Sequence, residues 1–343
     1  MRSWQLRKIS TVCLQCPSGC RASYESYSGK VVRVRGDFNS PASAGALCKL
    51  GRFNFNFINS PARLTEASVK GTGAVSVEEG LQAAAAGLEK VRDAAGGSAI
   101  GVLCGGMLTN EEYYLAQKLA RGALSTNNVD NVAGPWQQAV YDGLSNSLGM
   151  GAMTNTLDDI AKARAVLVLG SNTLEKHAIA ALKARKARRE EGGVLIVAHP
   201  EAVPLTKTAN MHLKLNVGTE DQLLLGLLKV VVAEGLFNQE YLDSYTQDLQ
   251  KLTKSLEKVS LADVAEKTGV AEEEIKEAAR LYAGQSPTCL VYGVDGNSPR
   301  NEGFYRMCAA LQLLLGSVGV VGGGVSVMGC ACLLYTSPSP RDS

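Results

Sequence analysis

The sequence has little net charge, no export signal and no dinucleotide fingerprint. Its 35 basic and 33 acidic residues leave a formal charge of +2, which indicates no polyanionic partner and no stripe typical of nucleic-acid binding. Residues 1–8 lack the apolar core of a signal peptide, and Arg2 and Arg7 are not a twin-arginine pair. No G-x-G-x-x-G pattern follows an expected strand, so we do not expect the chain to bind NADH itself. The composition is that of a globular protein, 45% hydrophobic over 343 residues, with room for two or three domains.

One stretch without a charged side chain, residues 307–340, is long enough to cross a membrane. It is crowded with glycines, however, and glycine runs favour turns over helix. We therefore expect a buried helix followed by a glycine-rich loop, with no direct membrane span. Residues 332–343 resemble a translated adapter from sequencing libraries, and their proline and serine content does not support a core. We treat them as a non-native tail and expect the native protein to continue past Ala331.

Four of the nine cysteines have the spacing of metal ligands. Cys13, Cys16, Cys20 and Cys48 form the pattern C-x2-C-x3-C-x27-C. Ligation by four cysteines in this way is typical of a [4Fe-4S] cluster, in which three closely spaced thiolates hold part of the cubane and a fourth closes it. A structural zinc site also uses four thiolates but is more often built from two matched pairs, so zinc is the weaker alternative and unrelated thiols the third. Cysteines used in this way fit a reducing compartment better than a disulfide framework.

Three basic residues lie beside these cysteines in the sequence, namely Arg21, Lys49 and Arg52. They could offset the negative charge of a thiolate-ligated cluster, and local charge is one of the factors that set a cluster's reduction potential. A solvated basic face is an equally good interpretation of the same three residues.

The segment that carries the cysteines is expected to be rich in β-structure. Two strand-like runs, residues 21–27 and 30–35, are joined at Ser28 and Gly29, which suit a hairpin turn. Such a hairpin would bring Cys48 back to the other three cysteines.

From about residue 60 the pattern changes to alternating helix and strand. Capping boxes that begin at Ser76, Thr109 and Thr219 predict three helix starts. Buried strands at 165–169 and 194–198 enclose a basic helix, and such a βαβ unit is the signature of a parallel sheet covered by helices. The basic helix of this unit is expected at 174–191. The other expected elements are strands at 99–104 and 289–292, and a helical region at 239–283.

The ordered blocks of the chain resemble the molybdopterin-guanine-dinucleotide oxidoreductases. The cysteine pattern followed by Gly51, Arg52 and Phe53 is similar to their iron–sulfur start. The segments that resemble blocks of formate-dehydrogenase catalytic subunits are residues 126–130, 151–155, 170–177 and 278–283. Within this family, residues 2–8 and the 27-residue gap before Cys48 resemble the large peripheral-arm iron–sulfur subunit of bacterial NADH–quinone oxidoreductase. In that branch the domain keeps the fold and the cluster but performs no molybdenum chemistry.

The resemblance implies an α/β fold in which a small β-rich [4Fe-4S] domain precedes Rossmann-like parallel-sheet domains. We expect the iron–sulfur domain at 1–58 and an inserted α/β domain with the βαβ unit at 132–285. A first α/β domain, discontinuous and truncated, is expected from 59–131 together with 286–331, and 332–343 is the non-native tail.

Several positions depart from the family pattern. Trp136 and Gln137 stand where formate dehydrogenases carry a metal-ligating selenocysteine or cysteine and a catalytic histidine. Tryptophan offers molybdenum no lone pair, and glutamine cannot shuttle a proton near neutral pH as histidine does. No Cys, Ser, Asp or His lies between Val132 and Val140, so a small alignment slip supplies no ligand either.

Three further departures concern the pterin and its surroundings. Residues 199–201 read His-Pro-Glu where the family has an Asp-Pro-Arg that contacts the dinucleotide, and residues 216–220 replace an Arg-Pro-Gly-Thr-Asp-like block. Leu50 stands in place of the lysine between cluster and pterin, with Lys49 one position early. Together these changes argue against a working bis-pterin molybdenum centre.

Gly170, Ser171 and Asn172 follow a strand and precede a helix. At such turns α/β folds bind phosphate groups on the N-terminus of the helix, so a vestigial pterin-dinucleotide site is expected here; an ordinary strand-to-helix turn is the alternative. His177 matches a family position near the cofactor, whereas His199 and His212 are expected to be ordinary polar residues. Cysteines in apolar segments are expected to be core residues; these are Cys104, Cys289 and Cys308.

These observations favour a [4Fe-4S]-binding electron-transfer or structural subunit of a respiratory oxidoreductase, like the peripheral-arm subunit of NADH–quinone oxidoreductase, with a degenerate molybdopterin site. The isolated chain is not expected to be catalytic, and molybdopterin guanine dinucleotide is expected at most as a vestigial ligand. Expected partners are other subunits of a membrane-associated respiratory complex, which would hold the chain on the cytoplasmic side of the inner membrane; no nucleic acid is expected. The alternatives are a catalytic molybdenum or tungsten bis-pterin enzyme resembling formate dehydrogenase, and a structural scaffold with zinc or no metal.

Overall fold

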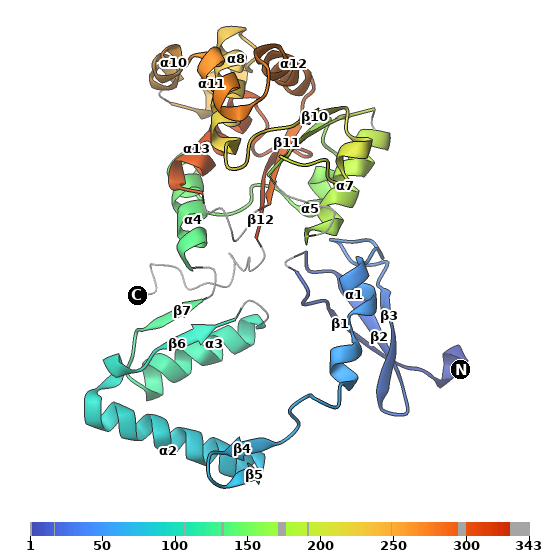
Figure 1. Ribbon diagram of the computed structural model, residues 1–343, viewed down its shortest axis with the longest axis vertical. Coiled ribbons are helices and arrows are strands. Elements are labelled where there is room, and N and C mark those ends of the chain that lie inside the picture. Colours follow the sequence, from blue (N-terminus) through green and yellow to red (C-terminus); the bar gives the residue numbers. More distant parts are fainter. Residues whose placement is uncertain are drawn as a thin grey trace.

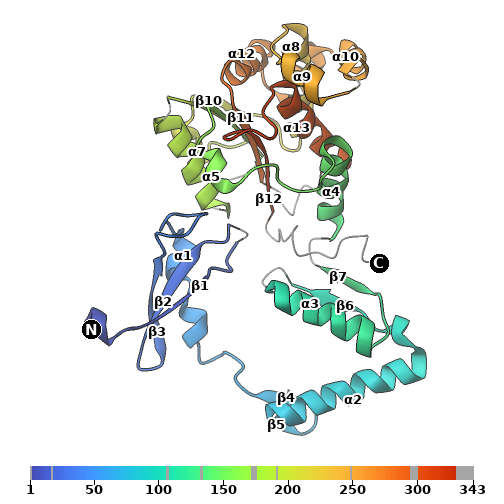
Figure 2. The same ribbon diagram turned by 180° about the vertical axis from the view of Figure 1, so that it is seen from behind.

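The computed structural model describes residues 2–16, 18–105, 108–131, 134–170, 176–190, 192–247, 249–293 and 300–329. Three parts follow one another along the chain: a small lobe that carries the four cysteines, an extended lobe of helices and short strands, and an α/β domain (Figure 1). The N-terminal lobe lies below α5 and α7 of the α/β domain in both views (Figure 2).

The cysteine lobe is a three-stranded antiparallel sheet in the order β1-β2-β3. Its strands are β1 (Arg7–Val12), β2 (Arg21–Tyr27) and β3 (Lys30–Gly36), and α1 (Lys49–Phe53) follows, with 3-10 turns at Ser3–Gln5 and Asn56–Asn59. The predicted hairpin is confirmed: Ser28 and Gly29 both have positive φ, 48° and 77°, as a tight two-residue turn of this type requires. Strand β1 is absent from the sequence-based prediction, because all six of its residues are exposed and its pattern lacks alternation.

The extended lobe consists of short strands and two longer helices. Its elements are β4 (Ala67–Val69), β5 (Gly73–Val75), α2 (Val77–Ala95), β6 (Val102–Cys104), α3 (Asn110–Lys118) and β7 (Val129–Asn131), with a 3-10 turn at Gly97–Ala99 and a π-helical turn at Leu119–Ala123. The capping boxes predicted at Ser76 and Thr109 are confirmed, since each hydroxyl accepts a hydrogen bond from the backbone three residues later. Strands β6 and β7 pair in parallel, and α2 buries none of its residues.

The α/β domain is built on a five-stranded parallel sheet in the order β10-β9-β8-β11-β12. Its strands are β8 (Ala165–Leu169), β9 (Val194–Ala198), β10 (Met211–Leu213), β11 (Thr288–Gly293) and β12 (Gly324–Met328). Every residue of β8, β9, β11 and β12 is buried. Continuous apolar runs of this kind are needed where helices cover both faces of a parallel sheet.

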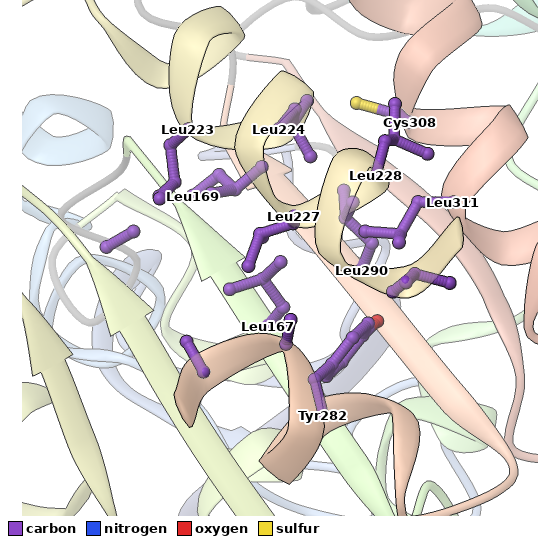
Figure 3. Packing of buried hydrophobic residues seen from close by; sticks show 14 of the residues in the cluster. Leu167, Leu169, Leu223, Leu224, Leu227, Leu228, Tyr282, Leu290, Cys308 and Leu311 are labelled. Atoms are coloured by element: carbon purple, nitrogen blue, oxygen red, sulfur yellow. The ribbon is translucent and has the colours of Figure 1, made fainter. Parts of the chain in front are cut away.

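Alternate strand residues face two separate cores. Leu167 and Leu290 point towards the larger core, where they meet leucines of α8 such as Leu227 (Figure 3). Val166 and Val291 face the smaller core on the other side of the sheet. Burying each such leucine or valine contributes roughly 1.5–3 kcal/mol, so the two cores are the main source of stability in this domain.

Different helices cover the two faces. The larger core is covered by α4 (Gly134–Leu148), α8 (Glu220–Ala233), α9 (Gln239–Tyr245), α10 (Leu249–Glu257), α11 (Leu261–Thr268), α12 (Glu272–Ala283) and α13 (Glu302–Leu314). The smaller core is covered by α5 (Leu157–Ile160) and α7 (Ala178–Glu190). A 3-10 turn at Thr206–Thr208 lies between β9 and β10. The predicted βαβ unit is therefore confirmed as β8, α7 and β9.

The strand pairing corrects the expected domain division. Residues 286–331 are expected to group with 59–131, but β11 pairs with β8 and with β12, so these two strands complete the sheet of β8, β9 and β10. The physical reason is that β11 and β12 are fully buried apolar strands, which need cover on both faces of the sheet. The tail, residues 332–343, lies outside the described residues.

Two local predictions also need correction. The capping box at Thr219 is wrong, because its hydroxyl donates to the Asn216 carbonyl at 2.8 Å instead of accepting a bond from α8. In the stretch that begins at residue 307, the buried helix is confirmed as part of α13, but the expected glycine-rich loop contains strand β12. In the described part of the chain no helix combines the length and the apolar character that crossing a membrane requires.

Candidate iron–sulfur site

Three of the four cysteines lie on the connection between β1 and β2. Cys13 directly follows β1 and Cys20 directly precedes β2, and the Cys13 amide donates to the Cys20 carbonyl at 2.8 Å. The antiparallel pairing of the two strands therefore brings the ends of the connection together, with Cys16 between them.

The fourth cysteine reaches the same place through α1. Cys48 is the N-cap of this helix, and its sulfur accepts a hydrogen bond from the Gly51 amide at 3.4 Å. Helix α1 packs against β3, so the predicted hairpin does return Cys48 to the other cysteines.

All four thiols line one pocket. Cys13 and Cys20 are buried, Cys16 and Cys48 are partly exposed, and none of the four forms a disulfide. The other residues around the pocket are Gln15, Leu47, Leu50 and Gly51 from the same lobe, and Lys176, Ala178 and Ile179 from the α/β domain. The sequence-predicted ligand set is thus brought together at the junction of two parts of the molecule.

Burial and mutual repulsion make these thiols reluctant to ionise. Loss of hydration, together with the charges of the neighbouring cysteines, raises the pKa of Cys20 to about 11. The same two causes raise the pKa of Cys13, with burial again the larger. Because metal ligation needs thiolates, binding must supply positive charge and release protons, as it does at protein metal sites in general.

The four thiols are the donor set from which a metal site would be built here. A tetrahedral zinc ion and a [4Fe-4S] cluster can each be held by four thiolates. The four thiols surround a shared space, and a four-cysteine donor set of this kind fits a [4Fe-4S] cluster.

Gly51 keeps that space open. A Cβ at this position would lie 3.3 Å from the Cys13 sulfur and 3.9 Å from the Cys48 sulfur. Both contacts are close enough for a larger side chain to fill the cradle between the two thiols. The φ of Gly51 is one that other residues can adopt, so the two nearby sulfurs are the constraint at this position.

The three basic residues named from the sequence are not the ones that meet the pocket. Arg21, Lys49 and Arg52 do not line it, and Arg21 lies 3.4 Å from the Asp37 carboxylate. The basic side chain that does line it is Lys176, which comes just before α7 in the α/β domain. Sequence reasoning missed Lys176 because no local pattern links it to cysteines more than a hundred residues away.

Gly170, the described member of the expected dinucleotide site, directly follows β8 and has a positive φ of 60°. Strand order reverses between β8 and β11, and crevices at such switch points bind ligands in α/β proteins. A Cβ at Gly170 would lie 2.8 Å from a carboxylate oxygen of Glu220, so two blocks singled out in the sequence meet here. The other two members of the expected site, Ser171 and Asn172, lie outside the described residues.

A buried ion pair lies at this edge of the sheet. The Arg300 guanidinium donates to Glu220 and, at 2.9 Å, to the Gly218 carbonyl, and both charged side chains are almost fully buried. Breaking such a pair from one side typically costs several kcal/mol. No sequence signal identified Arg300, because its partner is 80 residues earlier in the chain.

The positions expected to have lost the molybdenum ligand lie at the start of α4. Trp136 is in its first turn, with a side chain outside the described part, and Gln137 follows it partly buried. The departure therefore stays a prediction from sequence.

The three histidines differ sharply in environment. His177 is 1% exposed, and neither ring nitrogen has a hydrogen-bond partner among the described residues. Burial, with a smaller contribution from the charge of Lys176, lowers the pKa of His177 to about 4, so its ring is neutral at pH 7. His212 contacts the carbonyl of His199 through Nε2 at 3.0 Å, so these two lie side by side although they are distant in sequence.

The cysteines expected in the core are found there. Cys289 and Cys308 are fully buried and Cys104 nearly so. Burial raises the pKa of all three thiols, and for Cys289 it reaches about 11.

Two family models match the chain. The model described as "Molybdopterin oxidoreductase Fe4S4 domain" matches residues 6–60, which include all four pocket cysteines. The model described as "Molybdopterin oxidoreductase" matches residues 63–330.

Curated proteins and solved structures give consistent likenesses. The chain is 35% identical over 324 residues to the NADPH-Fe(3+) oxidoreductase subunit alpha of Geobacter sulfurreducens, covering 94% of this chain and 38% of that protein. It is 29% identical over 327 residues to the F420-dependent formate dehydrogenase subunit alpha of Methanocaldococcus jannaschii, covering 94% and 48%. Acetylene hydratase from Pelobacter acetylenicus has a similar fold, with a TM-score of 0.73 and 19% identity over 93% of this chain and 45% of that one. The chain therefore spans less than half the length of these proteins.

Proposed function

The chain belongs to the molybdopterin oxidoreductase family, and on that premise we propose that it is a segment of an oxidoreductase subunit that holds one [4Fe-4S] cluster for electron transfer. The observation that carries this proposal is the convergence of Cys13, Cys16, Cys20 and Cys48 on one pocket. The bound cluster would supply one-electron chemistry, with a potential set by the charge, hydrogen bonds and exposure around it.

The chain's own residues serve that cluster in distinct ways. The four thiolates would bind its irons, and the Gly51 amide already donates to the Cys48 sulfur, which lowers the negative charge on that ligand. Leu47 and Ile179 pack with the two buried cysteines and limit the access of water. The pocket is lined partly by the cysteine lobe and partly by the α/β domain, so the cluster site depends on the contact between these two parts.

The proposal includes a role like that of the large peripheral-arm subunit of NADH–quinone oxidoreductase, with a pterin site that no longer works. Support comes from Trp136 and Gln137 in place of the metal ligand and catalytic histidine, and from the altered block that ends at Glu220. Both relatives named above are alpha subunits by their names, which supports partner subunits here. Through such partners the chain would lie on the cytoplasmic side of the inner membrane.

A second candidate is a catalytic molybdenum or tungsten enzyme that oxidises formate or a similar small substrate. One observation favours it: Gly170 directly follows β8 at the switch point of the sheet, where a dinucleotide would be expected. The relative named as a formate dehydrogenase subunit points the same way.

Metal content distinguishes the candidates. The full-length protein, purified without oxygen, is analysed for iron, molybdenum, tungsten and zinc, as wild type and as Cys48→Ala. Loss of up to about four irons in the variant, with neither molybdenum nor tungsten in the wild type, would support electron transfer alone. Near-stoichiometric molybdenum or tungsten would favour the second candidate, and zinc in place of iron would refute both. The matched control is Cys104→Ala, which removes a buried thiol remote from the pocket in sequence and should leave the iron content unchanged.

A further inference from the structure

The α/β domain contributes one basic side chain to the cysteine pocket. Among the described residues that line it, Lys176 is the only one with an ionisable side chain apart from the four cysteines. Leu50 and Leu47, from the cysteine lobe, present apolar side chains to the same space. The positive charge at the pocket therefore comes from across the junction between the two parts.

The junction holds this part of the chain in place. Ile179, three residues after Lys176, packs in one buried cluster with Cys13 and Cys20, and Leu47 and Leu157 pack against it. The Lys176 side chain lines the pocket although it is exposed. Lys49 on α1 is exposed as well but does not line the pocket.

Lys176 is exposed, whereas the adjoining His177 and the nearby Ile179 are buried. The ring of His177 is neutral at pH 7, so it adds no second positive charge. The charge of Lys176 contributes to the lowered pKa of His177 as the smaller of two causes. Because Lys176 is exposed, water screens part of its charge, and its effect on the thiols is smaller than that of a buried cation.

We propose that Lys176 raises the reduction potential of the cluster through its charge, so that the α/β domain tunes a centre held by the other lobe. The inference rests on the proposed function. A thiolate-ligated cluster becomes more negative when it accepts an electron, and a nearby fixed cation stabilises that reduced state more than the oxidised one. No other group is required, since the electron is the only species transferred.

The test is a potentiometric titration of the full-length protein followed by electron paramagnetic resonance. At a fixed potential, Lys176→Met should lower the ratio of reduced to oxidised cluster roughly tenfold, the size expected for one unit charge roughly 12 Å away in a medium of effective dielectric about 20. For a one-electron couple a tenfold change corresponds to a shift of about 59 mV to lower potential. Lys176→Arg keeps the charge and should remain near the wild type, and Lys49→Met, the matched control, should shift far less.

The outcomes separate this inference from the proposed function. If wild type binds the cluster but Lys176→Met shifts no more than Lys49→Met, the role of Lys176 is refuted while the cluster assignment stands. If Lys176→Met fails to retain iron, the same criterion applies to Lys176→Gln. Loss of the cluster from both neutral variants would mean that the lysine holds the cluster rather than tuning it, which also overturns the inference. Absence of a cluster in the wild type would refute the proposed function itself.

Discussion

The buried ring of His177 should make the protein sensitive to mild acid. Burial lowers its pKa from the usual 6.5 to about 4, and no partner among the described residues stabilises the protonated ring. Above pH 6.5 the ring is neutral in both the folded and the unfolded chain, so it has no effect on stability. Between 6.5 and about 4 the unfolded chain binds a proton that the folded chain does not, and stability falls as pH falls.

The size of the effect follows from the two pKa values. One pKa unit corresponds to about 1.4 kcal/mol, so at about pH 5 the neutral ring costs the folded state roughly 2 kcal/mol relative to neutral pH. The free energy of unfolding is measured by urea denaturation at about pH 7.5 and pH 5 for the wild type and for His177→Phe. The wild type should lose roughly 2 kcal/mol more than the variant over this interval, because phenylalanine does not titrate.

The comparison between the variant and the wild type removes the contribution of every other titrating group. Equal losses in the two proteins would refute the reasoning, since they would mean that His177 accepts a proton in the folded state at its usual pKa. Lys176→Met is a useful second control. Removing the smaller, electrostatic cause should raise the pKa of His177 slightly and reduce the acid effect without abolishing it.

Three other changes test the site and the core. Cys48→Ala should abolish the cubane or convert it to a three-iron form, and a resonance spectrum identical to the wild type would contradict the ligand assignment. Gly51→Val should lower the iron content while circular dichroism stays unchanged, because its side chain would crowd the Cys13 sulfur; iron at the wild-type level would show that the cradle is not needed. Gln312→Leu should cost about 2–4 kcal/mol in urea denaturation, since buried Gln312 donates to the Tyr282 hydroxyl at 2.8 Å, and a loss below about 0.5 kcal/mol would contradict this.

Local sequence patterns predicted helices and strands correctly where the interaction that stabilises the element lies between residues close together in the chain. The capping boxes at Ser76 and Thr109 are confirmed because cap bonds join residues three apart. At Thr219 the same pattern gave a wrong prediction, because the Thr219 hydroxyl donates its hydrogen bond to the Asn216 carbonyl. Strand β1 is missing from the sequence-based prediction because all of its residues are exposed, so its sequence lacks an alternation of apolar and polar residues.

By itself the sequence predicted the four cysteines as a ligand set and determined the βαβ unit. Cys13, Cys16 and Cys20 are close along the chain, so their chemistry is visible in their spacing, and the continuous apolar runs of β8 and β9 already specify strands buried on both faces. The family resemblance added the fold, which the matches to residues 6–60 and 63–330 support.

Only the tertiary structure decided which distant residues surround these elements. It brought Lys176 to the cysteine pocket, paired Arg300 with Glu220, and placed β11 beside β8 rather than with the extended lobe. These contacts join residues that are far apart in the sequence. They form because whole helices and strands pack against one another. Spacing and periodicity describe only neighbours along the chain, so they carry no information about such pairs.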